Sequence, residues 1–103
     1  MALTSTLDGD GLLSVRLDGA LTIYEAAEVR EQLLALVDGA VAVELDLADV
    51  GEIDSAGAQL VLALARTLAA RDAGLRVTRT SAAVGEALNL LGLARHIPLA
   101  SAA

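Results

Sequence analysis

The sequence has no cysteine and no lysine, and only one histidine, one proline and one aromatic residue, Tyr24, among its 103 residues. The lack of cysteine excludes disulfide bonds, and a single histidine without cysteine excludes a structural zinc site. With one ring in the whole chain, a pocket lined by aromatic side chains is not expected. Hydrophobic residues nevertheless make up 55% of the chain, mostly alanine, leucine and valine. This composition favours helices packed closely on a sheet.

The charge is strongly negative, with 14 acidic residues against 7 arginines and a net charge of −7. Such a balance argues against binding to nucleic acid or to an anionic membrane surface, because both need clustered cations. The longest uncharged stretch, Ser55–Ala65, is about half the length of a membrane-spanning helix. Residues 1–6 lack the basic start of a signal peptide. We therefore expect a cytoplasmic protein, without membrane insertion, whose partners are proteins.

The first half of the chain predicts a hairpin, a helix and a strand. Residues 3–17 fit two strands around the turn Asp8–Gly11, and Asp18-Gly19 closes this hairpin. Residues 25–37 have helical spacing of apolar positions and stop at Gly39. Residues 41–47 alternate strictly between apolar and other side chains, which indicates a strand with one polar face.

The second half of the chain predicts a helix followed by a strand, twice in succession. A loop, Ala48–Asp54, leads to a helix with apolar spacing over 60–68, for which Gly74 is the expected C-terminal cap. Residues 75–78 alternate as a strand. Ser81 is placed to cap a third helix that ends at Gly92, with Val84, Leu88 and Leu91 facing inward. Residues 97–99 contain the single proline and fit a short edge strand.

These elements predict one domain over residues 1–103 of the α/β class. The strand–helix–strand units imply parallel neighbours with right-handed crossovers. Alternation within the strands indicates that helices cover mainly one face of the sheet. We therefore expect a two-layer fold with a mixed, mostly parallel sheet of four to five strands.

The segment Asp54-Ser55-Ala56-Gly57 joins the clearest strand to the clearest helix. In one interpretation, Asp54 or Ser55 is the helix N-cap, and Gly57 lets the helix approach the sheet. In the other, Ser55 is exposed and accepts a phosphate, which the free N–H groups and the positive end of the helix would tolerate. The residues alone leave both open.

The other polar residues do not form a catalytic or metal-binding pattern. A hydrolase elbow needs glycine two residues before the serine, where this chain has Ile53, and His96 is the only possible base. Asp49, Glu52 and Asp54 lack a rigid metal-ligand spacing and indicate a solvated rim. We therefore predict no catalytic residue, no metal site and no cofactor. Thr22 and Tyr24 fit a helix cap with a packed ring, or equally a contact surface near Ser55.

Three stretches resemble the STAS domain, the family of bacterial anti-sigma-factor antagonists. They are Leu17-Asp18-Gly19-Ala20-Leu21-Thr22; Leu45-Asp46-Leu47 through Ile53-Asp54-Ser55-Ala56-Gly57; and the closing helix, Val84 to Leu93. The stretch that ends at Gly57 is similar to the family's phosphorylation loop and is the most specific of the three. The resemblance spans essentially the whole chain and implies a lone STAS module.

The resemblance implies a phosphorylation-controlled binding protein rather than an enzyme. Ser55 matches the serine phosphorylated by a partner kinase, itself often the anti-sigma factor, and a PP2C-type phosphatase restores it. The unphosphorylated form binds the partner, and phosphorylation breaks that contact. The residues that the resemblance places at the partner surface are Thr22, Tyr24, Asp49, Glu52, Ile53, Asp54, Ala56 and Gly57.

The resemblance implies more than one pathway. The stretches Leu21–Glu28 and Ser55–Leu60 are more similar to stand-alone STAS proteins of bacterial chemosensory systems than to antagonists of a sigma-factor cascade that regulates transcription. Other stand-alone members are accessory subunits of lipid-transport ABC complexes. That role predicts a stable complex with an ATPase and little dependence on Ser55.

Overall fold

The computed structural model describes residues 2–99. In chain order its elements are β1 (Ala2–Leu7), β2 (Leu12–Leu21), α1 (Ile23–Val37), β3 (Ala42–Ile53), α2 (Ser55–Ala70), β4 (Gly74–Thr80), α3 (Ala82–Leu90) and a short 3-10 helix, η1 (Ala94–His96). The four strands form one sheet in the order β1-β2-β3-β4. β1 runs antiparallel to β2, while β2, β3 and β4 are parallel. The predicted α/β class and mostly parallel sheet are confirmed.

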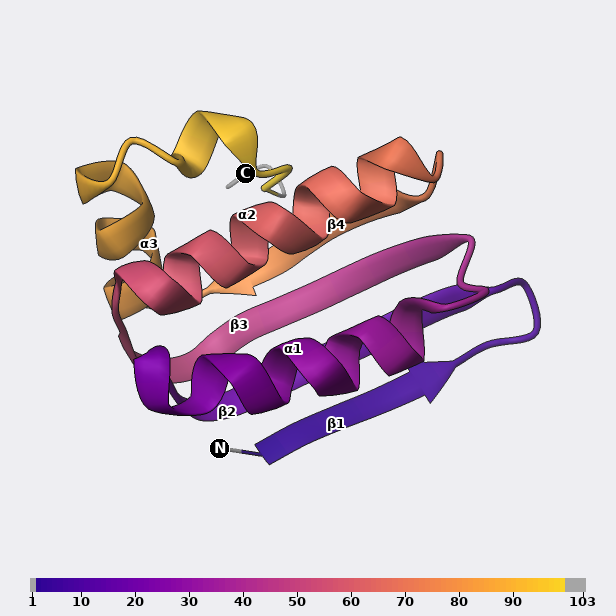
Figure 1. The fold of residues 1–103 in the computed structure, drawn as a ribbon, viewed down its shortest axis with the longest axis horizontal. Coiled ribbons are helices and arrows are strands. Elements are labelled where there is room, and N and C mark those ends of the chain that lie inside the picture. The colour runs from indigo at the N-terminus through magenta and orange to yellow at the C-terminus, as the bar shows by residue number, and fades with distance from the viewer. Residues whose placement is uncertain (1, 100–103) are drawn as a thin grey trace.

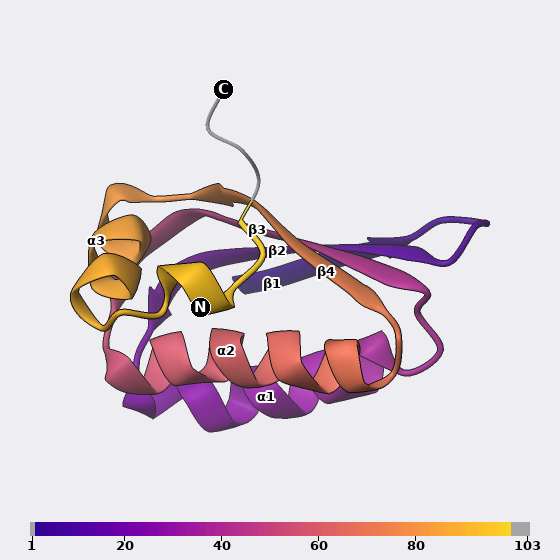
Figure 2. The ribbon, with the colours of Figure 1, turned by 90° about the horizontal axis from the view of Figure 1, so that it is seen from above.

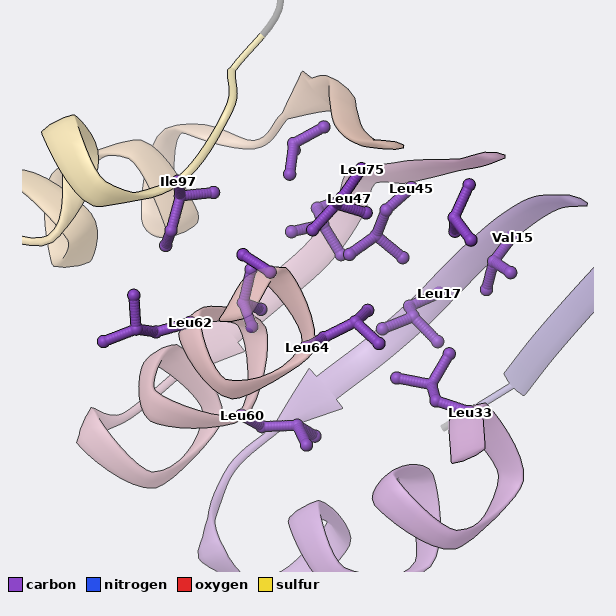
Figure 3. Packing of buried hydrophobic residues seen from close by; sticks show 14 of the residues in the cluster. Val15, Leu17, Leu33, Leu45, Leu47, Leu60, Leu62, Leu64, Leu75 and Ile97 are labelled. Carbon is purple, nitrogen blue, oxygen red and sulfur yellow. The ribbon is translucent and has the colours of Figure 1, made fainter. Parts of the chain in front are cut away.

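All the helices lie on one side of the sheet, as the strand alternation predicted (Figures 1 and 2). α1 and α2 run side by side beneath the strands, and α3 lies at one end (Figure 2). Apolar side chains of the strands point toward the helices and meet Leu33 of α1 and Leu60 and Leu64 of α2 (Figure 3). Leu45 and Leu47 of β3 are completely buried at the centre of this core. None of the helices within residues 2–99 is both long enough and apolar enough to span a membrane.

β2 and β3 continue well past the ends that the sequence predicted. Asp18-Gly19 does not close the hairpin, because β2 continues through irregular pairing to Leu21, with Gly19 at a φ of 112°. β3 likewise runs to Ile53, so the expected loop Ala48–Asp54 is wrong except for its last residue. The alternation is lost there because the register between β2 and β3 shifts, yet Val50 is fully buried and pairs with Gly19.

The ends of α2 and α3 differ in detail from the prediction. Gly74 is the first residue of β4 rather than the cap of α2, and Asp72 adopts the left-handed conformation after the helix, with a φ of 56°. Ser81 does cap α3, since its side chain accepts a hydrogen bond from the Val84 N–H. Leu91 is not inward but 44% exposed, because it lies past the last helical residue.

The expected last strand is reduced to a single bridge. Leu99 pairs with Val77 of β4, and the Val77 N–H donates to the Pro98 carbonyl at 2.8 Å. Residues 97–99 therefore line the β4 edge without forming a fifth strand.

Candidate functional site

The candidate site lies where β2 and β3 end and where α1 and α2 begin, at one end of the molecule (Figure 1). Only one residue separates β2 from α1, Thr22, and only one separates β3 from α2, Asp54. Because both connections are so short, the first turns of the two helices are held close to the sheet. Most of the residues proposed for the site from the sequence are in these two junctions.

Asp54 is the N-cap of α2, so the choice between Asp54 and Ser55 is settled. Its backbone is extended, with a φ of −117°, and its Oδ1 accepts a hydrogen bond from the Gly57 N–H at 3.0 Å. Ser55 is the first helical residue and is exposed. The capping task therefore falls on Asp54, and Ser55 is presented to solvent at the positive end of a helix.

The same carboxylate also binds the start of α1. Asp54 Oδ2 accepts a hydrogen bond from the Ile23 N–H at 2.9 Å. The N–H groups of Gly57 and Ile23 stabilise the ionised form and lower the pKa of the Asp54 carboxyl from its ordinary value. One side chain thus joins the N-termini of two helices and fixes Ser55 relative to Ile23.

Gly57 sits where no other residue fits. A Cβ added there would lie 2.1 Å from the Leu21 carbonyl oxygen and 2.9 Å from Cγ1 of Ile53. The first turn of α2 therefore packs directly on the end of β2, which confirms the predicted role of Gly57. Because Gly57 has no side chain, the first turn of α2, which carries Ser55, can lie close to the sheet.

Thr22 caps α1 and is buried, at 8% exposure. Its hydroxyl accepts from the Tyr24 N–H at 3.3 Å and donates to Glu25 Oε1 at 2.7 Å, and Glu25 Oε1 also accepts from the Thr22 N–H at 3.0 Å. These two bonds from Thr22 lower the pKa of the Glu25 carboxyl. Glu25 was not predicted from the sequence, although the Thr-x-x-Glu spacing is a capping-box signal.

The side chains of Ile23 and Tyr24 project into solvent at the start of α1. They are 67% and 90% exposed. The expectation of a ring packed on a neighbouring loop is therefore wrong for Tyr24. Because the Ile23 N–H is bonded to Asp54, the residue before Ser55, the start of α1 that carries these exposed side chains lies next to the start of α2.

Asp49 and Glu52 are strand residues rather than members of a loop rim. Asp49 forms an ion pair with Arg16 of β2, so its carboxylate is engaged on the sheet. Glu52 is exposed near the end of β3, opposite Ala20. Arg16 was not predicted, because its partner is 33 positions away and pairing depends on the strand register.

The remaining predicted contact residues are less accessible. Ile53 and Ala56 are half-buried, and Gly57 is buried. Within residues 2–99, no three histidine, cysteine, aspartate or glutamate side chains are grouped to hold a metal ion. His96, in η1, is exposed. The exposed residues of the site are therefore Ile23, Tyr24, Asp49, Glu52 and Ser55.

Comparison with protein families gives a match over residues 7–100 to the family described as "Mlab, STAS domain". The match covers both helix junctions and the whole sheet apart from most of β1. Comparison with curated proteins found no match.

Solved structures with the same fold include anti-sigma factor antagonists. One from Mycobacterium paratuberculosis is 26% identical with a TM-score of 0.78, over 95% of this chain and 85% of that chain. The antagonist SpoIIAA in its unphosphorylated form is 19% identical with a TM-score of 0.78, over 98% and 90% of the two chains. The phosphorylated form of the Bacillus cell fate determinant SpoIIAA is 21% identical with a TM-score of 0.72, over 98% and 93%.

Proposed function

The chain belongs to the STAS domain family, and on this premise we propose that it is a phosphorylation-regulated protein-binding module of bacterial signalling. It is an anti-anti-sigma-like partner switch that binds a kinase or anti-sigma partner while Ser55 is unphosphorylated. The observation that carries the proposal is the position of Ser55, exposed as the first residue of α2 beside exposed Ile23 and Tyr24.

Ser55 can be modified without loss of the fold. Asp54 caps α2, so phosphorylation of Ser55 removes no capping bond. The N–H groups and dipole at the helix start favour an added anion. A phosphate brings a charge of about −1.5 to −2, next to Asp54 and Glu52. The domain is therefore expected to remain folded while its surface changes in charge and shape.

The proposed partner contacts the surface on which the phosphate is added. Ile23 and Tyr24 offer apolar contact area at the same helix junction, and tyrosine is a common anchor of protein interfaces. A partner seated on these side chains covers Ser55 as well. A phosphate there opposes binding by repulsion of acidic groups and by its bulk.

Partners follow from the family. We assign the kinase role to an anti-sigma factor or a chemosensory protein and the restoring role to a PP2C-type phosphatase, with the chain acting in the cytoplasm. The names of similar structures describe anti-sigma factor antagonists and a phosphorylated form, which supports this assignment. We assign no catalytic residue and no cofactor to the chain.

The test compares three substitutions in a binding titration with the partner kinase. Ser55→Asp should weaken binding by at least about tenfold, about 1.4 kcal/mol, and Ser55→Ala should bind like wild type and resist inactivation by kinase and ATP. Ala82→Asp places the same charge at the first, exposed residue of α3 and is the matched control, which should bind normally. Equal binding of Ser55→Asp and Ala82→Asp would contradict the proposal.

A second candidate is an accessory subunit of a lipid-transport ABC complex. The matching family description names Mlab rather than an antagonist, which favours this role as the alternative. It is distinguished by stable co-purification with an ATPase and by binding that Ser55→Asp leaves unchanged.

A further inference from the structure

The outer side of β1 is the open edge of the sheet. β1 is the first strand in the order and pairs with β2 on one side only (Figure 1). Within residues 2–99, no strand pairs with its other side. The opposite edge, β4, is lined by residues 97–99 through the Val77–Leu99 bridge. The sheet thus has one edge free to receive a strand.

The backbone groups that face outward on β1 can be identified from the turn. The Asp8 N–H donates to the Leu12 carbonyl at 3.0 Å, so the backbone of residue 8 faces β2. Backbone direction alternates along a strand. Thr4 and Thr6 therefore bond to β2, whereas Leu3, Ser5 and Leu7 direct their N–H and carbonyl groups away from the sheet.

This edge lacks the features that normally prevent pairing. Exposed edge strands usually carry charges or proline, which oppose association with another strand. β1 has neither, although the chain carries 14 acidic residues. Leu7 is 63% exposed, and the other residues of β1 are exposed apart from half-buried Leu3.

Five of the six residues of β1 read the same in both directions: Leu3-Thr4-Ser5-Thr6-Leu7. A two-fold axis that pairs two identical strands antiparallel places residue i opposite the mirror position of the same segment. We propose that β1 is a self-association edge, which pairs antiparallel with β1 of a second copy about an axis at Ser5. With this palindrome, a second copy of the chain places threonine opposite threonine and leucine opposite leucine.

The proposed register uses every outward-facing backbone group. Ser5 lies opposite Ser5 of the partner subunit, and Leu3 lies opposite Leu7 of the partner subunit. Each such pair exchanges two hydrogen bonds. Within residues 3–7, a register centred on Thr4 pairs only the backbone groups of Leu3 and Ser5, so the axis at Ser5 is favoured.

The side chains agree with this register. Leu3 and Leu7 pair with Leu17 and Leu13 of β2, whose side chains are in the core, so both leucines lie on the helix-covered face. The pairing therefore extends the apolar face across the two-fold axis and covers the exposed Leu7. Thr4 and Thr6 face each other on the open face, where threonine pairs are favourable.

The association closes at two copies and depends on salt. Within residues 2–99, β1 is the edge strand that no other segment lines, because residues 97–99 lie against β4, so pairing of β1 with β1 closes at two copies. Two chains of net charge −7 repel each other. Added salt screens that repulsion, and the dimer should become tighter as the salt concentration rises. Ser55 remains accessible, because β2 separates β1 from β3 in the sheet.

A charge-swap experiment tests the proposal by sedimentation velocity over a wide range of protein concentration. Wild type should pass from 10.4 kDa to twice that mass as its concentration rises. Ser5→Lys and Ser5→Asp should each stay monomeric, because like charges then meet on the two-fold axis. An equimolar mixture should dimerise again. Asn89→Lys, an exposed change on α3, is the control and should dimerise like wild type.

Circular dichroism verifies that each variant is folded. If the charged variants misfold, Ser5→Pro removes the outward N–H while leaving the bonds of Thr4 and Thr6 to β2, and it should be monomeric. Wild type that stays at 10.4 kDa at every concentration would overturn the proposal. A dimer that persists when Ser5→Lys or Ser5→Asp is measured by itself would also overturn the proposal.

Discussion

Replacement of Gly57 by alanine tests the geometry that positions Ser55. The added Cβ would lie 2.1 Å from the Leu21 carbonyl oxygen, whereas ordinary contact begins near 3.4 Å. The first turn of α2 would have to move by roughly 1.3 Å, and its neighbour is backbone that cannot rotate away. Overpacking of this kind costs about 1–3 kcal/mol, and backbone as the obstacle favours the upper end.

Alanine also has the better helix propensity, by up to about 1 kcal/mol. We therefore expect Gly57→Ala to lower the free energy of unfolding by about 2 kcal/mol, measured by urea denaturation followed by circular dichroism. The matched control is Gly85→Ala in α3, where the nearest atom to an added Cβ is Thr80 Oγ1 at 3.9 Å. With no obstacle, that variant should gain about 0.5–1 kcal/mol.

The opposite signs of these two substitutions are the decisive feature. If Gly57→Ala were within about 0.5 kcal/mol of wild type, the close packing of α2 on the end of β2 would be wrong. A Gly85→Ala variant that is less stable than wild type would contradict the expectation that helix propensity decides the outcome where the added Cβ meets no obstacle.

Two further predictions concern the acid sensitivity of the junction and the core. The N–H groups of Gly57 and Ile23 lower the pKa of Asp54 in the folded state, so its contribution to stability is present above about pH 4 and is lost as the pH falls further. The free energy of unfolding should therefore fall less steeply with decreasing pH for Asp54→Asn than for wild type. Equal slopes would contradict the capping role. Leu64→Asp buries a charge at a site that is 5% exposed, and circular dichroism should show an unfolded chain, whereas its exposed neighbour variant Ala63→Asp should fold; a folded Leu64→Asp would refute the core packing.

Apolar spacing predicted the order of elements and most of the core. Leu45 and Leu47 alternate with polar residues and are fully buried, and Leu64 and Leu68 lie on the buried face of α2. These patterns are local, since each strand or helix turns one face to the helix–sheet interior. The N-caps Ser81 and Thr22 were equally predictable, because each acts within its own helix turn.

Features that depend on pairing between distant segments were not predicted. β3 extends to Ile53 because β2 continues alongside it through shifted register, and the sequence after Leu47 shows no alternation. The ion pair of Arg16 with Asp49 depends on the same register.

At the candidate site, the sequence left open how Asp54 and Ser55 divide their roles. Asp54 rather than Ser55 caps α2, and its other carboxylate oxygen binds the Ile23 N–H from another helix. The exposure of Tyr24 depends on this junction and has no counterpart in local spacing. The structure thereby adds Ile23 and Glu25 to the residues that shape the site.

The most direct test of the central claim is to treat the chain with its partner kinase and ATP and then measure both phosphate and affinity. Mass spectrometry should find one phosphate, on Ser55, and titration should show that the phosphorylated chain binds the kinase at least about tenfold more weakly than the unmodified chain. A phosphate on another residue, or equal affinity of the two forms, would contradict the account.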